Sequence, residues 1–365
     1  MSATCEHAAE QVTRQLGFNC HDVSPVVSVR NPFDLASWTM PVLELLIIAG
    51  AVFALVHAVR RFRAGDSIAL AMWFAPLVYL FVTEPPLYFP EWFALDKQFG
   101  FIFAHNLFTV QFMWDRLPLY IIAIYPALAM LAYELVRVLG IFRNRGTLIG
   151  SIAVAFVCQV FYEVFDQLGP QLKWWAWNGA NTDVNHPALA SVPMTSMLLF
   201  ASVSFGVMTY LVVRLVGPST GSGSIGRRGW SLTWRILLAG VLAPPAMGVF
   251  GIPSSIFGGD TPNITAQAWV IGVELGLVWL AGAWIIVTTL RRRGSEPVEP
   301  MTPFARVYPA TYLVVMAVFW VTALPAYFGA KHGITGDGTP IGSGLYALAC
   351  FIGAAALLGA LYSGR

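Results

Sequence analysis

The chain is poor in charged residues. Asp, Glu, Lys and Arg make up only 11% of its 365 residues, and 57% of the residues are hydrophobic. Soluble domains carry about 25% charged residues. A soluble core of this size cannot hide so much apolar surface, so we expect lipid to be the solvent. The net charge of +2 leaves no basic surface for nucleic acid, and we expect no nucleic-acid partner.

Motifs for common cofactors are also missing. The sequence has no HExxH helix, no CxxC pair, no P-loop and no GxGxxG segment after a strand. His105, His186, Glu163 and Asp166 have no spacing typical of a metal site. His57 is the one histidine suited to haem ligation within a span, and such ligation needs a pair. We therefore expect no metal and no cofactor.

Cysteine is scarce. Cys158 and Cys350 fall inside apolar stretches and are expected to pack in the core. Cys5 and Cys20 lie in the N-terminal segment 1–37, where both a disulfide and two free thiols are open alternatives. This segment contains several charges and no apolar run suited to a signal peptide.

The chain is rich in apolar stretches of membrane-spanning length. A transmembrane helix needs about 20 such residues. On that basis the sequence predicts an all-α, polytopic integral membrane helix bundle with about nine transmembrane helices. The predicted spans cover residues 38–59, 67–85, 117–139, 147–169, 190–214, 233–255, 266–289, 306–328 and 342–362.

Basic residues cluster after every second stretch. Such clusters mark the cytoplasmic side of a membrane protein. Counted by the predicted spans, 15 of the 21 Lys and Arg residues fall on one side. The sequence therefore predicts a multi-pass protein of the cell membrane, with its N-terminus outside and its C-terminus inside. The clusters are Arg60, Arg61 and Arg63; Arg137, Arg143 and Arg145; Arg214, Arg227, Arg228 and Arg235; and Arg291, Arg292 and Arg293.

The predicted organisation has four parts. An extracytoplasmic tail (1–37) precedes spans one to five (38–216), a Gly/Ser-rich cytoplasmic connector (217–229) and spans six to nine (230–365). The outer loops 86–116 and 170–189 are rich in aromatic residues, which suit the membrane interface. Within the first of these loops, segment 98–113 is apolar but short. It predicts a re-entrant or interface-lying helix.

Polar residues gather on the predicted outer side. Ionisable groups within spans are costly and commonly mark functional sites. Gln159, Glu163 and Asp166 follow the spacing i, i+4, i+7, which predicts one shared helical face. Glu84 ends the second span at a similar depth. We expect these groups to line a pocket that opens outward under an aromatic lid, together with loop residues His105, Asp115, Arg116, Trp174, Trp175, Trp177, Asn178 and His186.

The acidic pair on the fourth span allows three readings. Two buried carboxyl groups close together favour one protonated and one ionised form, the pattern of general acid–base chemistry. In that reading Glu163 and Asp166 are catalytic, and Glu84 and His105 assist. Alternatively, Arg116 or Lys173 neutralises Asp166 in a purely structural ion pair. A proton or ion path is the third reading.

Two other acidic residues lie within spans. Glu274 is near the middle of the seventh span and has no obvious partner in the sequence. It is read either as an interhelical hydrogen-bonding group or as part of the same site. Glu134 precedes Arg137 by three residues, a spacing that predicts a local ion pair near the inner interface.

One local pattern resembles a known family. The order Asp166-x3-Pro170-x4-Trp175-x-Trp177, followed by Val192-Pro193-Met194, is similar to a pattern of the carotenoid (bacterioruberin-type) hydratases. The likeness covers roughly 30 of the 365 residues, and Thr195-Ser196 stands where the family has Asn-Phe. Those polytopic membrane proteins add water to the terminal double bond of a C40 or C50 isoprenoid. The resemblance implies that Asp166 and Glu163 act as acid and base, and that the tryptophans stabilise a carbocation.

The preferred hypothesis is a membrane-embedded enzyme of hydratase or cyclase type that acts on a lipophilic, isoprenoid-like small molecule. One alternative is a binding or transport protein for a lipid or small solute, a class in which paired broken helices are typical. Another is an accessory subunit of a membrane complex, whose polar face would meet a partner helix. The bilayer is a partner in every case, and the sequence names no protein partner.

Overall fold

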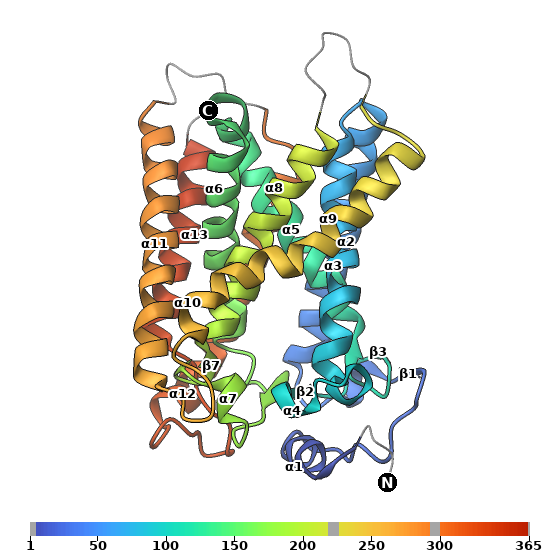
Figure 1. Ribbon diagram of the computed structural model, residues 1–365, viewed down its shortest axis with the longest axis vertical. Helices are drawn as coiled ribbons and strands as arrows, with labels where there is room; N and C mark the ends of the chain where they lie inside the picture. The colour runs from blue at the N-terminus through green and yellow to red at the C-terminus, as the bar shows by residue number, and fades with distance from the viewer. Residues whose placement is uncertain (1–4, 218–225, 293–299, 364–365) are drawn as a thin grey trace.

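The computed structural model describes residues 5–217, 226–292 and 300–363, most of them helical (Figure 1). Within these ranges, nine helical segments are long and apolar enough to cross a membrane. This confirms the predicted all-α bundle. The segments are α2 (Thr39–Arg63), α3 (Ser67–Tyr88), α5 (Leu119–Val138), α6 (Ile141–Asp166), η3 with α8 (Ser196–Val203, Ser204–Val216), α9 with η4 and α10 (Trp230–Gly248, Val249–Gly251, Ile252–Ser255), α11 (Ile264–Arg291), α12 (Pro303–Phe328) and α13 (Gly344–Ser363).

The centre of the bundle is formed by α5 and α6, the two most buried spans. α5 packs against α2, α3 and α6, whereas α6 also contacts α8, α11 and α13. The peripheral helices α9 and α11 expose large apolar side chains along their length, for example Leu237, Val241, Leu277 and Leu280. Such surfaces are compatible with contact with the lipid bilayer.

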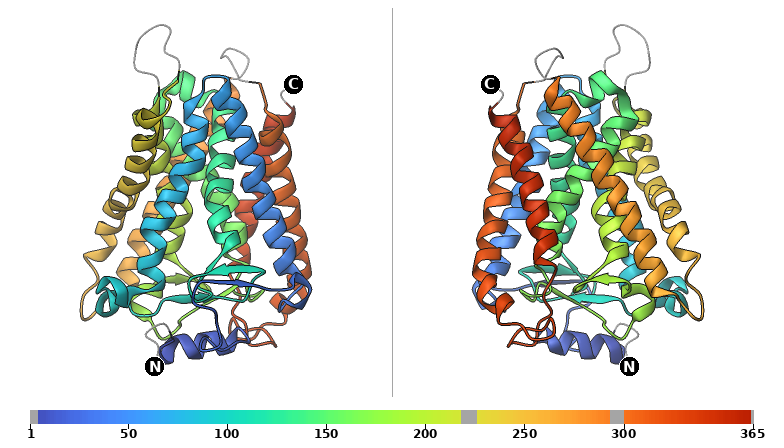
Figure 2. Two further views of the ribbon diagram at one scale, coloured as in Figure 1. Left: turned by 90° about the vertical axis from the view of Figure 1, so that its right-hand side faces the viewer. Right: turned by 90° about the vertical axis from the view of Figure 1, so that its left-hand side faces the viewer.

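The short strands and small helices gather at the end of the bundle that carries the N-terminus, opposite the C-terminus (Figures 1 and 2). Strand β3 lies between β1 and β4, and β2 pairs with β5 in the antiparallel direction. We call this end the strand end. Its elements are α1 (His7–Gln15), β1 (Val27–Val29), η1 (Pro32–Asp34), η2 (Pro90–Phe93), α4 (Asp96–Phe99), β2 (Phe103–His105), β3 (Val110–Phe112), β4 (Leu117–Pro118), β5 (Trp175–Trp177), α7 (Thr182–Asn185), β6 (Ala188–Leu189) and β7 (Val192–Pro193).

Two predicted elements are corrected by the structure. Segment 98–113 is not a helix: after the short α4, it forms β2 and β3. Extended chain satisfies its backbone groups by pairing with other segments, here with residues 175–177 and 27–29. The fifth span begins at Ser196 rather than at 190, because the preceding residues form the β6–β7 hairpin.

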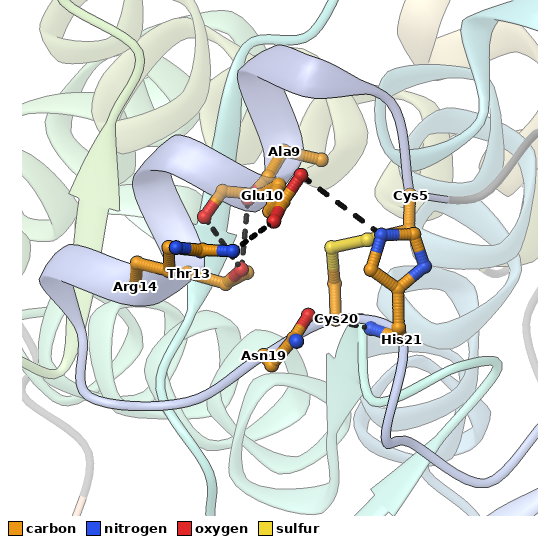
Figure 3. Close-up of a disulfide and its surroundings, with 8 residues drawn as sticks. All are labelled: Cys5, Ala9, Glu10, Thr13, Arg14, Asn19, Cys20 and His21. Carbon is orange, nitrogen blue, oxygen red and sulfur yellow. Dashed lines mark hydrogen bonds and ion pairs between the residues drawn. A yellow bond between two sulfur atoms is a disulfide. The ribbon is translucent and has the colours of Figure 1, made fainter. Parts of the chain in front are cut away.

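The N-terminal segment is tied down on the strand end. A disulfide joins Cys5 to Cys20, with a Cα–Cα distance of 5.6 Å, and closes the loop that contains α1 (Figure 3). Both cysteines pack in one hydrophobic cluster with Val12, Leu16 and Phe101. Of the two alternatives left open by the sequence, the structure therefore has the disulfide. The other cysteines, Cys158 and Cys350, are free and buried, as predicted.

The basic clusters lie at the other end of the bundle, where α2, α5, α8 and α11 end (Figure 1). Arg293 and residues 218–225 of the predicted connector lie outside the described residues. Arg137 donates to both carboxylate oxygens of Glu134 at 2.9 and 2.8 Å, which confirms the predicted ion pair. Nε2 of His57 lies 3.1 Å from the same carboxylate.

Candidate functional site

A cavity of about 120 Å³ lies where the spans meet the strand end. Its wall combines the ends of α3, α5 and α6 with β2, β5, α7 and the start of the fifth span. Segments far apart in the sequence are therefore joined around one space. Three of the four predicted catalytic residues line it: Glu84, His105 and Asp166.

Asp166 is the last residue of α6 and is almost fully buried, with 3% of its surface exposed. It forms no ion pair with any described residue, and its Oδ2 has no hydrogen-bond partner there. The chain turns directly after it. A Cβ at Gly169 would lie 2.0 Å from the ring of Trp175, so glycine is needed for the close approach. Asp166 thus lines the cavity with a carboxyl group that has no ion-pair partner among the described residues and no hydrogen-bond partner there for Oδ2.

Glu84 reaches the cavity from the last turn of α3 and is also buried. The hydroxyl of Tyr125, on α5, donates a hydrogen bond to its Oε1. The hydroxyl of Tyr88, one turn further along α3, also interacts with Glu84. The two carboxyl groups of the site are therefore in different environments. Glu84 is held by hydroxyl groups, whereas Asp166 is not.

His105 ends β2 and is held between two hydroxyl groups. The hydroxyl of Tyr88 lies 3.2 Å from Nε2, and that of Tyr120 lies 3.1 Å from Nδ1. Burial lowers the pKa of His105 to about 3, so its imidazole is neutral at neutral pH. A neutral imidazole has one donor and one acceptor nitrogen. One tyrosine therefore donates to the ring and the other accepts from it.

The rest of the wall is mainly aromatic. The register of β2 and β5 places Phe103 opposite Trp177 and His105 opposite Trp175. The rings of Phe103 and Trp177 lie 5.2 Å apart. The indole nitrogens of both tryptophans and Oδ1 of Asn185 have no hydrogen-bond partner among the described residues. Unsatisfied polar atoms in a buried wall are typical of a site that binds water or a ligand.

The fifth span contributes an unusual backbone to this wall. Ser196 and Phe200 line the cavity, and both belong to η3, a π-helix over Ser196–Val203. π-helical turns are uncommon and frequently occur at functional sites.

Comparisons with protein-family models, curated proteins and solved structures found no match for this chain. The site is therefore interpreted from its own geometry. Among the residues that the structure describes, no group of three or more His, Cys, Asp or Glu side chains could hold a metal ion.

Glu163 and Gln159 lie in a different environment from Asp166 and do not line the cavity. Gln159 donates to Oε1 of Glu163 at 3.2 Å, and Gln167 donates to Oε2 at 2.9 Å. Gln159 also donates to the hydroxyl of Tyr346 on α13 at 3.0 Å. Gln167 accepts a bond from the backbone N–H of Ser343 at 2.8 Å. The predicted shared face is thus divided, since Glu163 joins α6 to α13.

Three other candidates support the loops of the strand end. Trp174 donates to the hydroxyl of Thr39 at 3.1 Å, and Asn178 donates to the carbonyl of Phe101 at 2.8 Å. Asp115 forms an ion pair with Arg30 at 2.6 Å. None of these residues lines the cavity, nor does the half-buried His186.

Arg116 is buried, and its guanidinium lies over the ring of Phe101, 4.9 Å from the ring centre. Burial lowers the pKa of Arg116 to about 10, so the side chain stays charged at neutral pH. Neither Arg116 nor Lys173 neutralises Asp166, since Asp166 has no ion pair with a described residue. Glu274 is half-buried on α11 and also lies outside the cavity wall.

Several lining residues were not anticipated from the sequence, notably Tyr88, Tyr125 and Asn185. For Tyr88 a signal exists, because it follows Glu84 by four residues and so lies on the same helical face. Tyr125 and Asn185 carry no such local signal. Their place depends on how distant segments pack.

Proposed function

We propose that this protein is a membrane-embedded enzyme of hydratase or cyclase type that acts on a lipophilic, isoprenoid-like substrate. One observation carries the proposal: the uncommitted carboxyl group of Asp166 shares a small aromatic cavity with Glu84 and the neutral imidazole of His105. Carboxyl groups in unlike environments are the usual basis for dividing acid and base roles. The local likeness to the carotenoid hydratases, which includes Asp166, Trp175 and Trp177, is in keeping with this chemistry.

In the hydratase form, the carboxylic acid of Asp166 gives its proton to one carbon of an alkene. Water then bonds to the carbocation on the neighbouring carbon, and the proton that this water releases returns to the carboxylate of Asp166. The net change is the addition of one water. In the cyclase form, a second alkene of the same substrate attacks the cation, and Glu84 or Asp166 accepts the proton lost at the end. His105, between two tyrosine hydroxyls, can pass protons along this wall.

The size of the cavity limits what enters it. An apolar cavity of about 150 Å³ holds a benzene molecule. A space of about 120 Å³ therefore fits one end of an isoprenoid rather than its full length. We expect the reactive terminal double bond to lie in the cavity. This is the position that the carotenoid hydratase likeness would imply.

The strand end is assigned to the outer side of the cell membrane. The basic clusters lie at the opposite end, which the positive-inside rule places in the cytoplasm. The Cys5–Cys20 disulfide lies on the strand end, and disulfides persist in oxidising compartments outside the cytoplasm. Two independent features thus support one orientation, with the N-terminal tail extracytoplasmic.

The test compares lipid extracts of cells that express the wild type or Asp166→Asn. The wild type is expected to produce a lipid that is heavier than its precursor by one water, or a cyclised isomer of equal mass. Asp166→Asn is expected to lose at least about 100-fold of this activity, the usual size of a general-acid effect. Glu91→Gln is the matched control, because Glu91 is an acid at the same end that does not line the cavity. If the lipid extracts of wild-type and Asp166→Asn cells are identical while both proteins are folded in the membrane, the proposal is wrong.

A further inference from the structure

The cavity wall has acidic side chains but no basic ones. Two lining residues carry carboxyl groups and eight carry a Phe, Tyr or Trp ring, whereas the lining includes no Lys or Arg. The one lining histidine, His105, is neutral because burial lowers its pKa to about 3. The wall itself therefore has no positively charged group beside Asp166 and Glu84.

Two basic side chains at the strand end are occupied elsewhere. Arg30 pairs with Asp115 at 2.6 Å and also donates to Gln111 at 3.0 Å. The guanidinium of Arg116 lies over the ring of Phe101, outside the cavity wall. Asp166, which is 97% buried, keeps Oδ2 without a hydrogen-bond partner among the described residues. A buried carboxyl group without a partner takes the protonated form, and a cation beside it favours the ionised carboxylate.

Aromatic faces are themselves attractive to cations. The ring quadrupole attracts an alkylammonium group, most strongly for tryptophan and when water is excluded. Trp175 and Trp177 lie two residues apart on β5, and both line the cavity with Asp166. Cages of aromatic faces recognise quaternary ammonium groups, and a carboxyl group that ionises beside the cation adds an attraction between opposite charges.

We infer that this cavity is a cation-binding site, and that it binds a small alkylammonium group by contact with Trp175, Trp177 and the carboxylate of Asp166. The inference deepens the proposed function and rests on it for the location of the site, since the same wall would stabilise the positive charge that develops on a protonated alkene. The preference for charge is a property of the wall, so it is measurable without knowledge of the natural substrate.

The experiment uses the full chain, purified in a neutral maltoside detergent, and radiolabelled tetramethylammonium in equilibrium dialysis. Unlabelled choline and 3,3-dimethylbutan-1-ol are the competitors. They have nearly the same shape, but the second has carbon in place of the ammonium nitrogen. We expect saturable binding of one tetramethylammonium per chain, displaced by choline and at least about tenfold less well by the neutral alcohol, a difference of about 1.4 kcal/mol.

Variants locate the site. Asp166→Asn and Trp177→Leu are expected to weaken binding about tenfold or more, and Trp177→Phe, which keeps an aromatic face, is expected to bind better than Trp177→Leu. Glu91→Gln and Trp92→Leu are matched controls at the same end of the bundle, outside the cavity wall. They are expected to bind as the wild type does. Size-exclusion profiles show whether each variant is folded.

The outcomes separate the two proposals. Absent binding, or equal displacement by choline and the neutral alcohol, overturns the cation site even if the wild type converts a lipid. Binding that Asp166→Asn and Trp177→Leu leave unchanged also overturns it. Charge-selective binding that these variants weaken supports the cation site, including in a protein whose lipid extracts show no conversion.

Discussion

The hydroxyl of Tyr120 lies 3.1 Å from Nδ1 of His105, in a region where both side chains are buried. Tyr120 belongs to the first turn of α5 and His105 to β2, so this contact connects a span to the strand end. With Tyr88 on the opposite nitrogen, the neutral imidazole has a partner for its donor nitrogen and a partner for its acceptor nitrogen. Both hydroxyl groups could also accept from a charged ring, so burial rather than a missing partner keeps His105 neutral.

The first prediction concerns pH. Burial lowers the pKa of His105 to about 3 in the folded protein, from 6.5 in an exposed histidine. Below pH 6.5 the unfolded chain binds a proton at this residue and the folded protein does not. The folded state therefore loses stability as pH falls from 6.5 towards 3, by up to about 1.4 kcal/mol per pH unit. His105→Gln keeps a donor and an acceptor but does not titrate, so its melting temperature is expected to fall less between pH 7 and pH 5.

Comparison of the two melting curves isolates this group from the carboxyl groups, which titrate in both proteins. His186→Gln is the control, because His186 is half-buried and outside the cavity wall. It is expected to show the same pH dependence as the wild type. Parallel curves for the wild type and His105→Gln would show that His105 is not held neutral by burial.

The spans were predictable from the sequence because lipid imposes a local rule. Each span must be apolar for about 20 residues, and the number of Lys and Arg residues in each connecting loop indicates its side of the membrane. The strands at the strand end follow no such rule, since their pairing depends on distant segments. The apolar content of segment 98–113 predicts a helix, which the structure does not have. The alternation of Phe101, Phe103 and His105 with other residues, like the repeated Trp in 175–177, is a period-two pattern typical of strands.

The site shows a similar limit. Glu84 and Asp166 are grouped by their similar depth and His105 by its place in the outer loop, and all three line one cavity. Helical spacing alone also grouped Glu163 with Asp166. Three residues correspond to about 300° around an α-helix, which leaves the two side chains about 60° apart. Two neighbouring elements can still pack against such side chains separately. Here α13 supplies hydrogen-bonding partners for the Glu163 network, and no sequence pattern specified which helix would pack there.

The second prediction separates these two acids by stability. Glu163 accepts hydrogen bonds from Gln159 and Gln167, one on each carboxyl oxygen. In Glu163→Gln an NH₂ group replaces one of these oxygens and faces another donor, so one hydrogen bond is lost. Both bonds join residues four positions apart, and a hydrogen bond of this kind contributes about 0.5–1.5 kcal/mol. We expect a loss of this order for Glu163→Gln. Asp166→Asn breaks no hydrogen bond to a described residue and is expected to cost less stability than Glu163→Gln. Thermal melting in detergent measures both, and the reverse ranking would contradict the separation.

The third prediction concerns orientation. Asp183 on α7 is exposed at the strand end, and Arg228 is exposed at the opposite end. In intact cells, Asp183→Cys is expected to react with a membrane-impermeant thiol reagent, whereas Arg228→Cys reacts only after the cells are opened. The native thiols Cys158 and Cys350 are buried and give a low background. Labelling of Arg228→Cys in intact cells would invert the proposed orientation.

The fourth prediction concerns the disulfide. Cys5 and Cys20 are 15 residues apart, and a loop of this length is stabilised by about 3 kcal/mol when it is cross-linked. The double variant Cys5→Ser/Cys20→Ser is expected to release α1 from Phe101, because α1 is too short to hold its position by helix formation alone. Proteolysis between residues 5 and 20 is expected to accelerate while the bundle stays intact, since the spans pack without α1. Equal protection of the tail in both proteins would show that packing alone secures it.

The last prediction concerns the packing of α11 on α6. A Cβ at Gly282 would lie 2.1 Å from Cβ of Phe156, closer than side-chain atoms approach, so Gly282→Ala must push the two helices apart. Overpacking of this kind costs about 1–3 kcal/mol. Gly276 lies on the same helix with nothing within 4 Å of its added Cβ, and Gly276→Ala is expected to be neutral or to gain up to about 1 kcal/mol from helix propensity. The two substitutions are chemically identical, so a difference in melting temperature reports the helix contact itself. A lower stability for Gly276→Ala than for Gly282→Ala would mean that α11 does not pack on α6 in this register.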